Sequence, residues 1–102
     1  MELDVRCEAD TAVFTLSGEL DLATSDELHR AVRDALHAGS RSLVLDLSDI
    51  RFIDSSGISA LLETRTAARD ASATLQLGPL SARVSEVLRF TGVEHLFDPI
   101  DT

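Results

Sequence analysis

Apolar and polar residues alternate in the first two stretches of the chain. In residues 2–8, Leu3, Val5 and Cys7 share one side and charged residues occupy the other, which is typical of a half-buried strand. We therefore expect Cys7 to point into the core as a small apolar group. Residues 12–16 are rich in β-branched and aromatic side chains and predict a second strand. The short connection between the two favours an antiparallel pair.

A helical periodicity follows. Between Leu28 and Leu36, apolar residues recur at i, i+3, i+4, i+7 and i+8, which is one face of an amphipathic helix. Residues 24–27 fit a capping box, in which Thr24 caps the helix and Glu27 reaches back to it. Gly39 stands where a left-handed residue would end the helix.

The middle of the chain predicts a strand, a helix and another strand. Residues 43–47 form a nearly continuous apolar run, which is typical of a central strand covered on both faces. The sequence Asp-Ser-Ser-Gly at 54–57 then leads into a second amphipathic pattern that ends at about Ala71. Residues 73–77 alternate again and predict a strand closed by residues 78–79, which are Gly-Pro.

The last third predicts one short helix and one short strand. Ser81 can cap a helix that ends before Gly92, and residues 93–100 leave room for an edge strand around Leu96–Phe97. The order ββαβαβαβ predicts an α/β fold with a mixed β-sheet and helices packed on it. Its first hairpin is antiparallel, and its βαβ core is parallel with right-handed crossovers.

Length and composition limit the class of protein. A chain of 102 residues is expected to form a single domain over 1–102. No apolar run approaches the roughly 20 residues that a membrane-spanning helix needs, and the first residues lack the pattern of a signal peptide. One cysteine leaves no internal disulfide framework. These features predict a cytoplasmic protein.

The charge of the chain narrows the choice of partner. Nine basic and 18 acidic residues give a formal net charge of −9. Nucleic-acid binding draws much of its affinity from phosphate neutralisation, so a nucleic-acid partner is not expected. Direct contact with an anionic membrane is disfavoured for the same reason. A protein partner with a basic or mixed surface fits better.

The Asp-Ser-Ser-Gly turn is the candidate site, because a helix start offers unpaired N–H groups and partial positive charge to a hydroxyl or a phosphate. No base for either serine is evident, since His29 and His37 fall off the apolar face of the first helix and are expected to be solvated. Asp46, Asp49 and Asp54 resemble the acidic pocket of a receiver domain, but the chain has no lysine. It also has no phosphate-binding loop or dinucleotide fingerprint. We expect no enzyme activity, cofactor or metal.

Four segments, taken together, carry a resemblance that extends from about residue 12 to residue 97. They are Gly-Glu-Leu-Asp at 18–21, Leu-Val-Leu-Asp-Leu-Ser at 43–48, Phe-Ile-Asp-Ser-Ser-Gly-Ile at 52–58, and residues 84–93, which contain Val84, Val87, Leu88 and a final Thr-Gly-Val. In their order and spacing the chain resembles the STAS family, and specifically the small bacterial anti-sigma factor antagonists.

The resemblance implies a STAS fold and partner switching. In that family the antagonist binds an anti-sigma factor that is also a serine kinase with a histidine-kinase-like ATPase fold, which releases the sigma factor for transcription. Phosphorylation of the serine directly after the Asp, here Ser55, inactivates the antagonist, and a phosphoserine phosphatase reverses it. The partner-binding residues implied for this chain are Asp21, Thr24, Asp54, Ser55, Ser56 and Gly57.

Three alternatives remain open at this stage. The chain could be a non-phosphorylated STAS structural subunit of a membrane lipid-transport ATPase complex. It could be a hydrolase that uses Ser55 as its nucleophile. In the simplest alternative, Ser55 and Ser56 only cap a helix.

Overall fold

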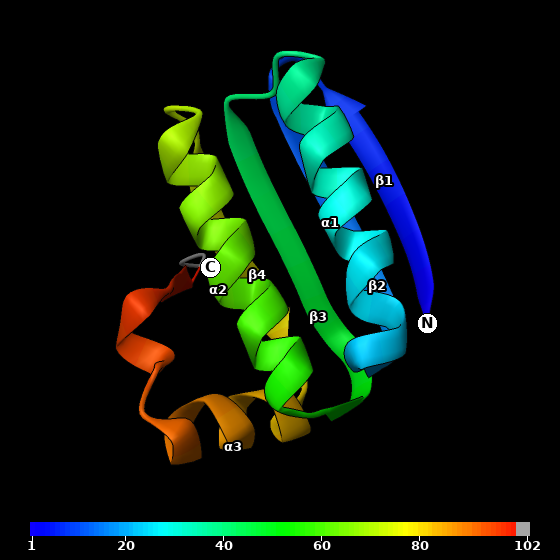
Figure 1. Ribbon diagram of the computed structural model, residues 1–102, viewed down its shortest axis with the longest axis vertical. Coiled ribbons are helices and arrows are strands. Elements are labelled where there is room, and N and C mark those ends of the chain that lie inside the picture. The colour runs from blue at the N-terminus through cyan, green and yellow to red at the C-terminus, as the bar shows by residue number, and fades with distance from the viewer. Residues whose placement is uncertain (100–102) are drawn as a thin grey trace.

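Five strands form one mixed sheet in the order β1-β2-β3-β4-β5 (Figure 1). The structure is a computed structural model that describes residues 1–99. Its elements are β1 (Glu2–Glu8), β2 (Thr11–Leu20), α1 (Leu22–His37), β3 (Ser42–Ile53), α2 (Ser55–Asp70), β4 (Thr74–Leu80), α3 (Ala82–Thr91), a 3₁₀ turn (Glu94–Leu96) and β5 (Asp98–Pro99). The predicted order of strands and helices is confirmed, and residues 100–102 of the predicted 1–102 domain lie outside the described residues.

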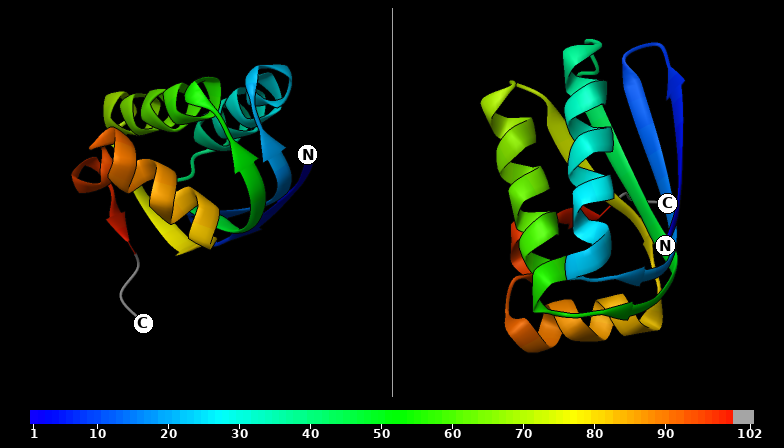
Figure 2. Two further views of the ribbon diagram at one scale, coloured as in Figure 1. Left: turned by 90° about the horizontal axis from the view of Figure 1, so that it is seen from below. Right: turned by 45° about the vertical axis from the view of Figure 1, so that its right-hand side comes forward.

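The topology of the sheet puts α1 and α2 on the same face. β1 pairs with β2 antiparallel, and every later neighbour is parallel, as the sequence predicts. Because the strands lie in chain order, successive right-handed crossovers all step in one direction and leave their helices on one side. Figures 1 and 2 show α1 and α2 side by side over that face.

The core lies between this face and the helices. Phe14, Leu45 and Leu77 are buried there, whereas Val44 and Asp46 on the opposite face of the sheet are only half-buried. The prediction of a central strand covered on both faces is therefore wrong for this part of β3. The pattern misled because three of its five residues, Leu43, Leu45 and Leu47, share the core face, and the outer face carries only Val44 and Asp46.

The predicted burial of Cys7 is also wrong. Leu3, Val5 and Cys7 lie opposite core residues of β2, so the predicted face is right. However, Cys7 is exposed and Val5 is 40% exposed, because β1 is an edge strand and α1 contacts it little. Alternation identifies the face of a strand, but the position of the covering helix decides burial.

Strand ends differ from the prediction where the sheet is irregular. β2 and β3 continue to Leu20 and Ile53, with register shifts between Thr15 and Ser17 and between Gly18 and Glu19. Bulges add residues that break the alternation and increase the local twist. The later parts of both strands therefore lack the alternating pattern by which strands are predicted.

The end of the described chain shows two smaller differences. The Gly-Pro pair at 78–79 lies within β4 and does not close it. A 3₁₀ turn occupies 94–96, and the edge strand is 98–99, slightly later than predicted. The predicted segment ends at Ile100, outside the described residues.

The predicted helix-boundary positions at Ser81, Gly92 and Gly39 are confirmed. The Ser81 hydroxyl accepts a hydrogen bond from the backbone N of Val84 at 3.1 Å, and α3 ends at Gly92 with φ of +76°. Gly39, just beyond α1, has φ of +99°. Both glycines occupy left-handed positions that other residues adopt at a cost.

Candidate functional site

The ends of β2 and β3 bring the predicted site residues together at one edge of the sheet. Leu20 and Ile53 are paired in the parallel ladder. The next residue in each segment, Asp21 and Asp54, is the N-cap of the following helix. Residues 21–24 and 54–57, here called the paired turns, therefore begin from adjacent positions of the same sheet.

The first of the paired turns is a closed capping box. The Asp21 Oδ1 accepts a hydrogen bond from the backbone N of Thr24 at 3.1 Å, and the Asp21 N donates to Thr24 Oγ1 at 3.0 Å. The Thr24 hydroxyl is also 3.0 Å from the carbonyl oxygen of Glu19. The predicted box from Thr24 to Glu27 is thus wrong, because β2 continues to Leu20 and α1 begins two residues before Thr24.

The second of the paired turns uses its carboxylate for the cap and leaves its hydroxyls free. The Asp54 Oδ1 accepts a hydrogen bond from the backbone N of Gly57 at 3.0 Å. Ser55 and Ser56 occupy the first turn of α2, Ser55 exposed and Ser56 half-buried. Within residues 1–99, neither hydroxyl takes part in a hydrogen bond. The alternative in which the serines serve as caps is therefore wrong.

Gly57 joins the two turns through backbone packing. It is buried, and a Cβ at this position would fall on the carbonyl oxygen of Leu20 and lie 2.6 Å from the Cγ1 of Ile53. The backbone N of Asp54 also donates to the Leu20 oxygen at 3.4 Å. The start of α2 therefore rests directly on the end of β2, which only glycine permits.

Two exposed apolar side chains, one within the first of the paired turns and one just before the second, were missed in the sequence. Leu22, the first residue of α1, is 75% exposed, and Phe52, two residues before Asp54, is 42% exposed. Leu22 lies six residues before Leu28 and therefore off the apolar face of its helix. This spacing could have predicted that Leu22 is exposed. Large apolar side chains exposed beside polar groups are typical of protein interfaces.

The acidic residues do not form a metal site. No group of three or more His, Cys, Asp or Glu side chains among the described residues is arranged to hold a metal ion. The Asp46 Oδ1 instead accepts hydrogen bonds from the backbone N and the hydroxyl of Ser48, at 3.0 and 2.7 Å. Glu19 and Arg51 form an exposed ion pair at 3.4 Å, which contributes at most about 1 kcal/mol.

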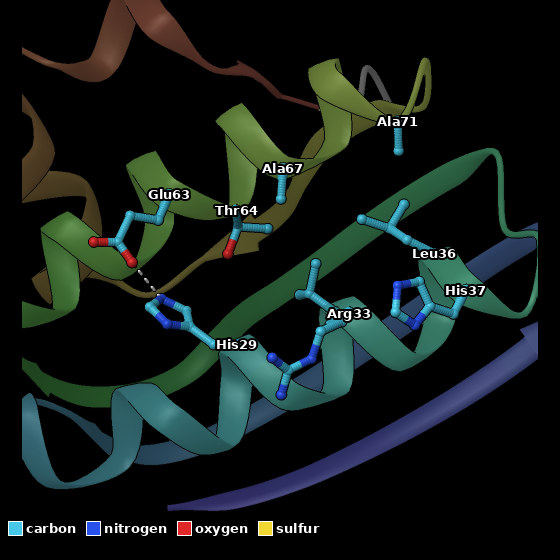
Figure 3. Close-up of a pocket in the computed structure, with 9 residues that line it drawn as sticks. His29, Arg33, Leu36, His37, Glu63, Thr64, Ala67 and Ala71 are labelled. Atoms are coloured by element: carbon cyan, nitrogen blue, oxygen red, sulfur yellow. Dashed lines mark ion pairs between the residues drawn. The ribbon is translucent and has the colours of Figure 1, made fainter.

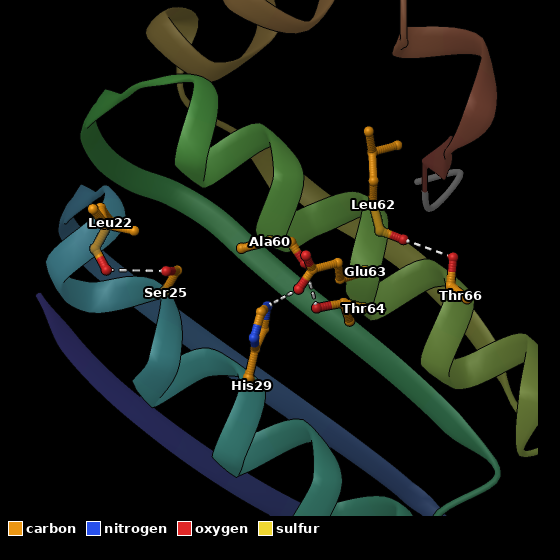
Figure 4. A network of polar contacts seen from close by, with 8 residues as sticks. All are labelled: Leu22, Ser25, His29, Ala60, Leu62, Glu63, Thr64 and Thr66. Atoms are coloured by element: carbon orange, nitrogen blue, oxygen red, sulfur yellow. Dashed lines mark hydrogen bonds and ion pairs between the residues drawn. The ribbon is translucent and has the colours of Figure 1, made fainter.

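The histidines lie away from the serines. The Nε2 of His29 is 2.9 Å from the Oε2 of Glu63 on α2, without hydrogen-bond alignment, and the His29 side chain is 35% exposed (Figure 4). The prediction that His29 is solvated is therefore wrong, whereas His37 is exposed as predicted. In the part of the chain that the structure describes, no histidine bonds to Ser55, so no nucleophile–base pair is formed.

Comparisons with known proteins agree with this architecture. A family model described as "Mlab, STAS domain" matches residues 3–98. An anti-sigma-B factor antagonist of Staphylococcus aureus is 26% identical over 81 residues, which are 79% of this chain and 75% of that protein.

Solved structures show the same fold. The anti-sigma factor antagonist SpoIIAA in its unphosphorylated form has a TM-score of 0.81 at 20% identity, covering 98% of this chain and 89% of that one. SpoIIAA of Bacillus in its phosphorylated form has a TM-score of 0.75 at 20% identity, covering 98% and 92%. Among the described helices, none is both long and apolar enough to cross a bilayer.

Proposed function

The chain belongs to the STAS-domain family, and we propose that within it this protein is an anti-sigma factor antagonist regulated at Ser55. In this proposal the protein binds an anti-sigma factor that is also a serine kinase, and the sigma factor is released. Phosphorylation of Ser55 ends that binding, and a phosphoserine phosphatase restores it. The protein itself performs no catalysis.

The accessible hydroxyl of Ser55 is the observation that carries the proposal. Ser55 is exposed at the first position of α2, while its neighbour Ser56 is half-buried. Asp54 already supplies the cap, so a kinase can phosphorylate the Ser55 hydroxyl without opening the first turn of the helix. The name of the S. aureus relative supports an antagonist, and the solution of SpoIIAA in a phosphorylated form supports a phosphorylation switch in such a protein.

A phosphate at Ser55 is compatible with the fold. It adds a charge of about −1.5 to −2, and the start of α2 offers partial positive charge and N–H groups to it. The neighbouring carboxylates of Asp54 and Asp21 remain at the same edge of the sheet. A partner surface fitted to a neutral hydroxyl would meet additional bulk and negative charge, so the switch acts on the interface and leaves the fold intact.

The paired turns supply the rest of the proposed interface. Asp21, Asp54 and the serines provide polar contacts, and the exposed side chains of Leu22 and Phe52 provide apolar ones. Apolar anchors surrounded by polar groups are the usual composition of a protein–protein interface. The carboxylates match a kinase surface that is basic or mixed.

The family match is compatible with a second candidate. The matching model is described as "Mlab, STAS domain", which states the domain but not its partner. A STAS subunit of a membrane lipid-transport ATPase complex would use the same edge as a permanent contact and would need no modifiable serine.

A pull-down with the unmodified chain and with Ser55→Asp distinguishes the two functions. The proposal predicts that the unmodified chain retains a small histidine-kinase-like ATPase and that Ser55→Asp loses it. Capture of a transporter ATPase by both forms would replace the proposal with the second candidate. Ser59→Asp, on an exposed position one turn along α2, is the matched control for added charge.

A further inference from the structure

The outer edge of β1 is open to a further strand. Among the described strands, β1 pairs only with β2, in an unbroken antiparallel register that runs from Glu2–Ser17 to Glu8–Thr11. It lies at one margin of the sheet (Figure 1). Every second residue of such a strand turns its backbone N–H and C=O groups away from its neighbour. These groups are a template for one more strand.

The usual devices that protect an edge strand are missing from β1, apart from its charges. Residues 2–8 contain no proline or glycine, and no bulge interrupts their described register with β2. Proline, bulges and a covering helix are common ways to block an edge, but α1 contacts β1 little. On the side of the strand that faces the helices, Val5 is 40% exposed and Cys7 is exposed. An added strand would therefore meet apolar surface as well as free backbone.

The other side of β1 carries an ordered set of charges. The charged positions alternate with Leu3, Val5 and Cys7 and are all exposed. In chain order they are Glu2, Asp4, Arg6 and Glu8. Within residues 1–99, none of the four takes part in an ion pair. With three acids and one base, this side of the strand has a net charge of −2.

A second copy of the chain is a poor match for these charges. An antiparallel pair over the whole strand would be centred on Val5 and would place Asp4 opposite Arg6 of the other copy. The same register places Glu2 opposite Glu8. Opposite charges that face each other stabilise a strand pair, and like charges destabilise it. The two attractive pairs are thus offset by two repulsive ones, and two chains of charge −9 repel each other overall.

The groove between α1 and α2 has no comparable order of charge (Figure 3). Its volume is about 350 Å³. Glu63 offsets the charge of Arg33, and the Arg33 guanidinium is turned away from the groove. The outer edge of β1 is therefore the better-defined surface for a charged partner.

We propose that the outer edge of β1 binds an extended, antiparallel segment of a protein partner, in which charged and apolar residues alternate. The charged residues of this segment run base, acid, base, base from its N-terminus, opposite Glu8, Arg6, Asp4 and Glu2 in turn. Its apolar residues lie beside Val5 and Cys7. Backbone hydrogen bonds supply affinity in this mode of binding, and the order of the charges sets the register. The proposal does not rest on the proposed function.

The test is a titration of the full chain with the end-blocked peptide Lys-Val-Glu-Val-Lys-Val-Lys, measured by calorimetry and by backbone amide chemical shifts. The control peptide, Glu-Val-Lys-Val-Lys-Val-Lys, has the same composition, alternation and net charge. However, it places Glu opposite Glu8 and Lys opposite Arg6. We expect saturable binding of the first peptide, at least fivefold tighter than that of the control, with the largest shifts in residues 2–8.

Arg6→Glu separates pairing in this register from a general attraction between opposite charges. Position 6 then faces Glu of the first peptide and Lys of the control, so the preference for the first peptide should disappear. Arg89→Glu makes the same change in net charge at an exposed position of α3 and should keep the preference. The proposal is overturned by absence of saturable binding, by equal affinities of the two peptides for the unmodified chain, by a preference that persists in Arg6→Glu, or by shifts centred outside residues 2–8.

Discussion

The paired turns share a backbone plan but use their side chains differently. Each follows a parallel strand and begins a helix with an aspartate cap. At the first turn, the Thr24 hydroxyl is engaged by the Asp21 backbone and its carboxylate. At the second turn, Asp54 alone makes the cap, and the hydroxyls of Ser55 and Ser56 make no hydrogen bond within the described residues.

This difference separates a structural turn from one available for modification. A hydroxyl that holds a capping box cannot be modified without opening the helix start, because its hydrogen bonds would be lost. An exposed hydroxyl beside a complete cap can be modified at little cost in stability. Ser55 meets this condition, and Thr24 does not.

Gly57→Ala should cause the largest loss of stability, because it disrupts the contact that holds the second turn against β2. The added Cβ would fall on the Leu20 carbonyl oxygen. Because this is a backbone atom, the clash can be relieved only if α2 or the end of β2 shifts. We expect a loss of about 2–3 kcal/mol in the free energy of unfolding, measured by chemical denaturation. Alanine at the adjacent position, Ser56→Ala, is the control, and equal stability of the two variants would contradict the packing described for Gly57.

Ser55→Asp has the next largest expected effect and tests the second of the paired turns as a switch. We expect it to weaken kinase binding at least tenfold, or about 1.4 kcal/mol, because a carboxylate is placed beside Asp54 at the interface. Ser55→Ala should bind as the unmodified chain does, and both variants should melt within a few degrees of it. Calorimetric titration with the kinase gives the affinities, and equal affinities for the two variants would rule out an electrostatic switch.

Asp21→Ala tests whether the first turn is structural. Loss of the cap is expected to cost about 1 kcal/mol, which corresponds to roughly 4–8 °C in Tm for a chain of this size. Asp21→Asn keeps an oxygen that can cap and removes only the charge, so its melting should stay close to that of the unmodified chain. If both variants melt normally, Asp21 has no capping role of consequence.

The same pair also separates capping from binding. With a basic or mixed kinase surface, Asp21→Asn should lower the affinity several-fold while the fold stays stable. Unchanged affinity for Asp21→Asn would restrict the proposed interface to the second turn and its apolar neighbours.

Ser56→Ala should have the smallest effect. Its hydroxyl is half-buried and makes no hydrogen bond among residues 1–99, so we expect a change of less than about 0.5 kcal/mol in stability. Kinase affinity should fall by no more than about twofold, the loss of one polar contact at the edge of the interface, and phosphate incorporation should be that of the unmodified chain. A large loss of either would mean that Ser56, and not only Ser55, contributes to the switch.

The sequence predicted those features that depend on local rules. The Asp-Ser-Ser-Gly turn between strand and helix, the Ser81 cap and the left-handed Gly92 all follow from residue type and short spacing. The mixed topology also followed, because short connections favour antiparallel pairing and helical ones favour parallel pairing. The roles assigned to Ser55 and to the residues around it stay predictions.

Features that depend on tertiary placement were not predictable in this way. The exposure of Cys7 is decided by how far α1 extends over the sheet, which alternation in β1 does not encode. The predicted capping box joins Thr24 and Glu27, whereas the observed one joins Asp21 and Thr24. The choice between them depends on where β2 ends, and the irregular register around Gly18 conceals that end.

The most direct test of the central claim is to incubate the chain with its anti-sigma factor kinase and Mg-ATP, then measure its intact mass and map the modified peptide. The account predicts one phosphate, located on Ser55, with full incorporation in Ser56→Ala and none in Ser55→Ala. A phosphate on Ser56 alone, full labelling of Ser55→Ala, or a kinase that binds the chain without modifying it would contradict the account.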